Sequence, residues 1–130
     1  MTTKDDQVSL TKLGRADAVP DRNLETFPIS DPSQEITIDC QEFTCRCPVT
    51  GQPDWATICI QYQPGDRAVE TKSLKLYLET FREERIFHEH LATKLRDDLA
   101  DALKPVSLRV TVSFNVRGGI ALAATSSYRG

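Results

Sequence analysis

Hydrophobic and polar residues alternate without a break from Val106 to Val116. Every even-numbered position there is apolar and every odd-numbered one is serine, threonine, arginine or asparagine, as expected for a strand with one buried and one wet face. The same period predicts a strand over residues 34–40. Residues 55–63, rich in threonine, isoleucine and tyrosine, predict another. After the turn at 117–119, residues 120–125 predict the start of a last strand.

The spacing of apolar residues becomes helical after residue 70. One face then carries apolar side chains three and four positions apart, namely Leu74, Tyr77, Leu78 and Phe81. Thr71 is the expected N-cap of this helix. Leucines spaced four apart predict a second amphipathic helix over residues 88–103, which ends at the pair Lys104–Pro105.

The predicted order ββααββ indicates an α+β fold, with an antiparallel sheet and both helices on one side. Residues 34–130 are expected to form this single domain. The open edges of such a sheet favour assembly with other copies of the chain. Residues 1–33 are polar and contain three prolines, so they predict a mobile or surface-lying N-terminal arm.

Composition and charge narrow the classes of function. The net charge of −3 provides no basic field for nucleic acid. No apolar run reaches the roughly 20 residues of a membrane span, and no signal peptide is evident. We therefore expect a cytoplasmic protein with reduced thiols. The four cysteines form no C-x-x-C pair, and His88 and His90 are the only histidines, so no metal site is expected.

The turn-rich segment TCRCPVTGQPD, residues 44–54, contains the first candidate chemistry. Pro48 and its neighbours restrict the backbone around the thiol of Cys47. Asp54 would disfavour the thiolate by like-charge repulsion, so it would serve better as a proton shuttle. This pair suits addition of sulfur to a multiple bond that is protonated as it is attacked. A structural cysteine in a turn is the commoner alternative.

Two further segments are candidate binding sites. Lys72 and Lys75 share a face at the start of the first helix, where N–H groups favour anions. Without a glycine-rich fingerprint, a nucleotide cofactor would be held there by charge. Glu89 could accept paired N–H donors of a flat heterocycle, and His88 could act as an acid, donor or orienter. The alternatives are a solvated basic face and ordinary helix capping.

Four segments in this order, CPVTGQPD, ETKSLKLY, FHE and RGG, resemble the NADPH-dependent 7-cyano-7-deazaguanine reductases. These are the short, single-domain nitrile reductases of queuosine biosynthesis, a tRNA modification pathway. The resemblance covers residues 34–119, about two-thirds of the chain. Each motif is modest alone, but the four in sequence are highly specific.

The resemblance implies the tunnelling fold, a ββααββ unit that closes with neighbouring copies into a barrel, typically as stacked rings, with pockets between subunits. It implies that Cys47 adds to the nitrile of a 7-deazapurine to give a covalent thioimide and that Asp54 is the proton donor. His88 belongs to the same catalytic set. Two hydrides from NADPH then give the aminomethyl product.

The resemblance also implies the residues that bind ligands. Those for the substrate are Val69, Glu70, Thr71, His88 and Glu89. Those facing the cofactor are Lys72, Ser73 and Lys75. Arg117 is a further candidate contact for the cofactor phosphates. Many relatives have serine where this chain has Thr71, and the added methyl would trim the pocket.

Two other functions remain open. A cyclohydrolase or pterin synthase would share the fold, but such enzymes usually need a metal site with several histidines, and this chain has two. A non-catalytic assembly subunit, or a protein that binds a purine or pterin, would also share it. Retention of Cys47, Asp54, His88 and Glu89 together argues against that alternative.

Overall fold

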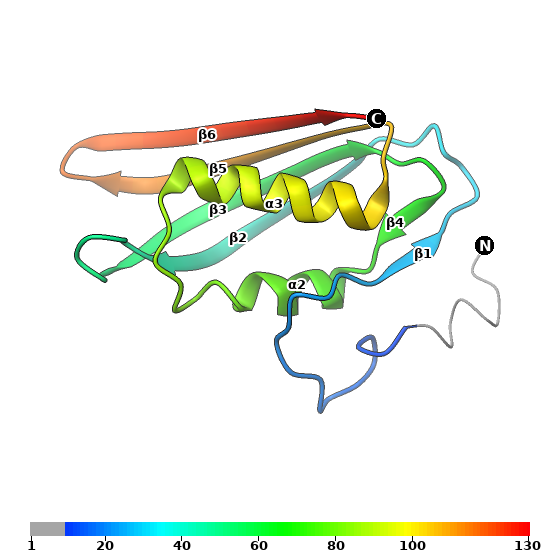
Figure 1. Ribbon diagram of the computed structural model, residues 1–130, viewed down its shortest axis with the longest axis horizontal. Helices are drawn as coiled ribbons and strands as arrows, with labels where there is room; N and C mark the ends of the chain where they lie inside the picture. The colour runs from blue at the N-terminus through cyan, green and yellow to red at the C-terminus, as the bar shows by residue number, and fades with distance from the viewer. Residues whose placement is uncertain (1–9) are drawn as a thin grey trace.

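The structure is a computed structural model that describes residues 10–130 (Figure 1). In chain order its elements are β1 (Thr26–Pro28), β2 (Ile36–Arg46), β3 (Pro53–Gln63), β4 (Arg67–Val69), α2 (Thr71–Glu79), α3 (His88–Leu103), β5 (Ser107–Arg117) and β6 (Ile120–Arg129). Neither helix is long and apolar enough to cross a membrane.

The main sheet has four antiparallel strands in the order β2-β3-β5-β6, and both helices cover one face of it (Figure 1). The predicted α+β fold with ββααββ order is thus confirmed. Strand β2 runs six residues further than the predicted 34–40, through Arg46. A register shift between Cys40 and Phe43 breaks its alternation, which explains why the pattern concealed its second half.

A second, two-stranded ribbon joins β1 to β4 and was not predicted. Each strand has three residues, too few for a period of two to emerge from the sequence. The ribbon nevertheless matters for the site, because it brings residues 25–28 beside the start of α2.

The core lies between the helices and the inner face of the sheet. Its fully buried aromatic and aliphatic side chains come from β3, β5, α2, α3 and the link after α2, and the largest are Ile58, Ile60, Tyr77, Phe81, Leu91, Leu95, Leu99, Leu103, Val110 and Val112. The leucines spaced four apart thus form the buried stripe of α3. Helix α3 ends at the predicted position, where Lys104 adopts a left-handed conformation (φ 46°).

Helix α2 is capped differently from the prediction. Its N-cap is Glu70, and Thr71 is its first helical residue. The Glu70 carboxylate accepts hydrogen bonds from the N–H groups of Lys72, at 2.7 Å, and Ser73, at 2.9 Å. Thr71 has the residue type that usually caps a helix. Here Glu70 has the extended backbone of a cap, and its longer side chain accepts from the N–H groups of Lys72 and Ser73. The expectation for Thr71 was therefore wrong.

The predicted arm packs on helix α2 in its described part. Residues 1–9 lie outside the described residues. Beyond them, Lys12 and Glu25 are buried, and Arg22 stacks over the Phe81 ring at 3.7 Å. Residues 10–28 therefore lie on the surface in fixed contact with the domain.

Candidate active site

The β2–β3 turn holds Cys47 in one position. The N–H of Cys47 donates to the carbonyl of Gln52 at 2.8 Å, and the N–H of Gly51 donates to the carbonyl of Cys47 at 2.9 Å. Gly51 adopts φ 73°, and an added Cβ there would lie 2.5 Å from the Arg85 guanidinium. The end of the Arg85 side chain could move aside, so it is the positive φ that favours glycine at this position.

The chain that leads into α3 is attached to the end of β2. The N–H of Arg46 donates to the Glu84 carbonyl at 2.9 Å, and the N–H of Ile86 donates to the Arg46 carbonyl at 3.2 Å. These two bonds place the first residue of α3, His88, beside the turn that carries Cys47 (Figure 1).

The environment of the turn favours the Cys47 thiolate. Hydrogen bonds from the Thr50 hydroxyl and from the N–H groups of Thr50 and Val49 lower the pKa of the Cys47 thiol, and Asp54 opposes that shift. By contrast, burial raises the pKa of Cys45 to about 12. Burial also raises the pKa of Cys40 and Cys59. Cys47 is therefore the thiol best prepared to act as a nucleophile.

Asp54 lies at the centre of a buried polar group. Its side chain is only 2% exposed. One carboxylate oxygen lies 3.2 Å from His88 Nε2, and the other accepts a hydrogen bond from Arg117. The His88 ring stacks on Phe114, with centroids 3.4 Å apart and planes 4° apart. Strands β3 and β5 and helix α3 thus converge on this carboxylate.

Arg117 has a different partner from the one expected. We predicted it as a contact for cofactor phosphates. In the chain alone it binds the Asp54 carboxylate and lies 3.3 Å from the Gln52 side-chain oxygen. About half of its side chain stays exposed, so a ligand can still reach it.

The predicted ligand-binding residues before and within α2 form a second group. Val69 and Glu70 are buried. The Ser73 side chain is fully buried and lies 3.0 Å from the Glu70 carbonyl. Thr71 and Lys75 are exposed, and Lys72 is half-buried. Glu70 and Ser73 therefore support the turn from inside, whereas Thr71 and Lys75 face solvent.

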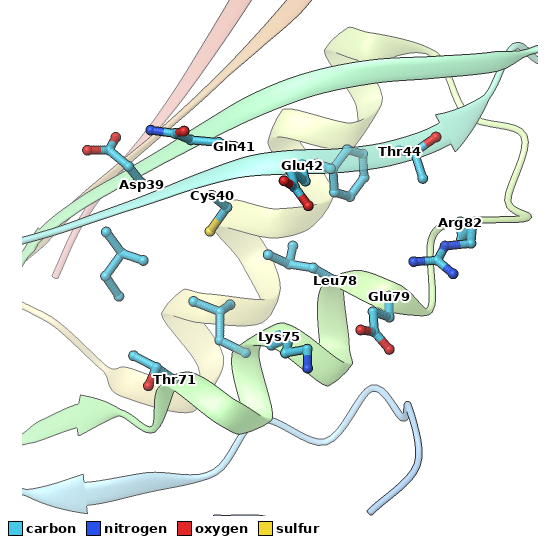
Figure 2. A pocket seen from close by; sticks show the side chains of 13 residues that line it. Asp39, Cys40, Gln41, Glu42, Thr44, Thr71, Lys75, Leu78, Glu79 and Arg82 are labelled. Carbon is cyan, nitrogen blue, oxygen red and sulfur yellow. The ribbon is translucent and has the colours of Figure 1, made fainter.

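A groove of about 480 Å³ runs between β2 and α2 (Figure 2). Cys40 from β2 and Leu78 from α2 point into it, and Thr71 and Lys75 line it. Cys47 and Asp54 are not among its lining residues. This groove is thus separate from the reactive thiol.

Two of the N–H donors at the start of α2 are already occupied within the chain. We expected these groups to add to the pull of Lys72 and Lys75. The Glu70 carboxylate already accepts from two of them and adds a negative charge. The backbone contribution to an anion site is therefore smaller than expected, and the prediction for Lys72 and Lys75 rests on their side chains.

The two groups of predicted residues do not meet within one chain. The β2–β3 turn, the start of α3 and the β5–β6 hairpin lie at one end of the domain (Figure 1), and there Asp54 contacts His88 and Arg117. Glu89, also at the start of α3, is exposed. Helix α2 begins away from that end, next to β4 (Figure 1).

Several residues of the site escaped the sequence reasoning. Thr50 donates toward the thiol, and Phe114 supports the His88 ring. Thr50 lies in a turn already singled out, so its hydroxyl was a usable signal. For Phe114 the sequence pattern predicted only a core position in its strand. Within residues 10–130, no three His, Cys, Asp or Glu side chains gather as metal ligands would.

The chain is thus an α+β protein of ββααββ order, with the thiol of Cys47 and the carboxylate of Asp54 near one end of its main sheet. The family profile described as "QueF-like protein" matches residues 53–129, and the chain belongs to this family. It is 75% identical over 122 residues to the NADPH-dependent 7-cyano-7-deazaguanine reductase of Frankia casuarinae, covering 94% of this chain and 98% of that one.

More distant proteins agree with this assignment. The protein of the same name from Syntrophus aciditrophicus is 46% identical over 130 residues, covering 98% of this chain and 92% of its own. Among solved structures, the apo archaeosine synthase QueF-Like superposes with a TM-score of 0.71 at 22% identity, covering 78% of this chain and 98% of that one. At that identity the similarity supports the fold alone.

Proposed function

We propose that this protein is an NADPH-dependent 7-cyano-7-deazaguanine reductase, which converts a nitrile to an aminomethyl group in queuosine biosynthesis. The observation that carries the proposal is the thiol of Cys47, whose pKa is lowered and which is held in a rigid turn near the buried Asp54. The name and 75% identity of the Frankia relative supply the substrate class.

The chemistry begins with a carbon–sulfur bond. The sulfur of Cys47 attacks the nitrile carbon, and the nitrile nitrogen takes up the proton that the thiol gives up, with Asp54 as the carrier. The product is a thioimide on Cys47. Two molecules of NADPH, bound in turn, would each supply one hydride to the carbon, and two protons taken up in these steps complete the amine. Cys47 leaves as the thiolate after the first reduction, so the enzyme is regenerated.

His88 and Arg117 prepare Asp54 for this transfer. Both bind its carboxylate oxygens, which fixes the carboxylate with respect to the thiol. Stacking on Phe114 fixes the His88 ring in turn. Asp54 is almost fully buried, so its carboxylate is largely shielded from bulk water.

The cofactor is held by side-chain charge. Lys72 and Lys75 lie on the exposed side of the first turn of α2, which suits the phosphates of NADPH. Arg117 can add a third cation from another element. Ser73 supports this turn from inside and has no exposed surface.

The complete site requires a second copy of the chain. Thr71 and Lys75 line the groove beside β2, away from Cys47, so a neighbouring subunit must bring one group to the other. Strands β2 and β6 are the edges of the main sheet and can pair with other copies to close a barrel. We infer a homo-oligomer of stacked rings, with Glu89 and the Val69–Thr71 segment around the 7-deazapurine.

We place the reaction in the cytoplasm, where reduced thiols and NADPH are available. The substrate is a small molecule, so neither direct contact with nucleic acid nor contact with a membrane is part of the proposal.

Mixing the protein with 7-cyano-7-deazaguanine and following NADPH oxidation tests the proposal directly. We expect two NADPH consumed per nitrile, and at least about a thousandfold loss in Cys47→Ala, because the nucleophile is gone. Cys59→Ala is the control and should retain activity, because Cys59 lies on the face of β3 opposite the buried Ile58 and Ile60. Absence of oxidation in the wild type would point to a non-catalytic binding protein, whereas full activity in Cys47→Ala would refute Cys47 as the nucleophile.

A further inference from the structure

Residues 11–25, called here the N-terminal loop, are closed by a buried carboxylate that the proposed chemistry does not use. Glu25 is 8% exposed. Its carboxylate accepts hydrogen bonds from the N–H of Thr11, at 2.9 Å, and the N–H of Lys12, at 3.2 Å, and from the Thr11 hydroxyl. The two ends of the loop are thereby joined, as in a compact Ω-loop.

A buried ammonium group closes the same loop a second time. Lys12 is 5% exposed, and its Nζ lies 2.5 Å from Asp21 Oδ1 and 2.6 Å from the Asn23 carbonyl. The Lys12 ammonium lowers the pKa of Asp21, with help from the Asn23 N–H. Since an unpaired buried charge is costly, these contacts favour one shape of the loop.

The closed loop is attached to the first turn of α2 through Glu25. The N–H of Glu25 donates to the Ser73 Oγ at 2.9 Å, and its carbonyl accepts from the N–H of Glu70 at 2.9 Å. Ser73 is fully buried by this contact. The position of the turn and the docking of the loop are therefore linked.

The loop also binds the side chain of Lys72. Lys72 Nζ donates to the Arg15 carbonyl at 2.5 Å. Asp17 lies close enough that its pKa is lowered chiefly by Arg15 and, to a smaller degree, by Lys72. An ammonium has three donors, so one bond to Arg15 directs the group and leaves two donors for a phosphate.

We propose that the N-terminal loop aims Lys72 at the cofactor and that Glu25 is the positioning residue that docks the loop. The inference rests on the proposed function in one respect, namely that the first turn of α2 binds NADPH. Holding Lys72 in advance removes part of the entropy lost on binding. Undocking the loop therefore weakens the binding of NADPH and leaves the attack of Cys47 on the nitrile intact.

The test compares Glu25→Ala, Glu25→Gln and Lys12→Met with the control Glu35→Ala, an exposed glutamate outside the loop. We expect Glu25→Ala and Lys12→Met to speed tryptic cleavage after Arg15 and to raise the Kd of NADPH about three- to tenfold, the effect of one immobilised side chain. Glu25→Gln, which keeps an acceptor for Thr11, should restore most of the affinity.

A second readout separates this role from general loss of structure. Formation of the Cys47 adduct without NADPH, followed by intact mass, should stay within about twofold of the wild type in Glu25→Ala. The proposal is overturned if the loop is released and the Kd is unchanged, if adduct formation falls in parallel with NADPH binding, or if the loop stays protected. Wild-type protein that binds NADPH without reducing the nitrile would refute only the proposed function. Wild-type protein that binds no NADPH would refute both.

Discussion

The turn around Cys47 and the first turn of α2 both come from short, recognisable motifs, but they are built in opposite ways. At Cys47 the reactive side chain is presented to the surface, and residues from three other segments converge behind it. At α2 the motif alternates between buried supports, Glu70 and Ser73, and outward-facing side chains such as Lys75.

The difference shows that a motif is not the same as a site. The letters ETKSLK resemble a ligand-binding segment as a whole, yet Glu70 caps its own helix and Ser73 holds the N-terminal loop. In CPVTGQPD, by contrast, most residues serve one purpose, which is to fix the thiol and the carboxylate. The first motif therefore mixes stability with binding, and the second concerns chemistry.

Mixing two inactive variants tests whether each site combines the Cys47 turn of one chain with the α2 turn of another. Cys47→Ala removes the thiol, and the double variant Lys72→Glu/Lys75→Glu reverses the charge of the α2 turn. If each site combines the thiol of one chain with the α2 turn of another, co-assembly of the two inactive variants should restore about a quarter of wild-type activity by random pairing.

NADPH oxidation by the co-refolded mixture measures this recovery, and native mass spectrometry verifies that mixed oligomers formed. Each variant refolded alone is the control. Mixed oligomers without activity would place both groups of one site in the same chain, contrary to the proposed assembly.

Much of the fold was accessible from the pattern because local signals and tertiary structure agree. Strand β5 alternates cleanly and α3 carries leucines four apart, so each element indicated its own buried face. The bulge between Cys40 and Phe43 concealed the second half of β2, and the three-residue strands β1 and β4 were too short to be detected from the sequence pattern.

The candidate site was less accessible, because its contacts join residues distant in sequence. Arg117 and Asp54 are 63 positions apart, and Glu25 and Ser73 are 48 apart. No spacing rule links such pairs. Cys47 and Asp54 were predictable because a single hairpin turn carries both.

Glu70 and Glu89 test the distinction between a residue that stabilises the fold and one that binds the substrate. Glu70→Ala removes the acceptor for two N–H groups of α2 and should lower the free energy of unfolding by about 1–2 kcal/mol. Glu89→Ala changes an exposed residue and should alter stability by no more than about 0.5 kcal/mol, while weakening substrate binding.

Thermal and urea unfolding measure the first effect, and the KM for the nitrile measures the second. Equal loss of stability in the two variants would contradict the distinction drawn here, as would an unchanged KM in Glu89→Ala.

The smallest expected effect concerns the thiol itself. The Thr50 hydroxyl is the largest of the influences that lower the pKa of Cys47, so Thr50→Val should raise that pKa. At a pH below both values less thiolate is present, and alkylation of Cys47 by iodoacetamide should slow about two- to fivefold. A more basic thiolate is also a better nucleophile, which limits the change.

The pH profile of alkylation distinguishes this effect from a distorted turn. The slower alkylation of Thr50→Val should disappear as the pH rises above both thiol pKa values, because both proteins are then fully ionised. Thr57→Val, on β3, is the matched control and should follow the wild-type profile. If the ratio of the two alkylation rates were the same at every pH, Thr50 would govern access to the thiol rather than its ionisation.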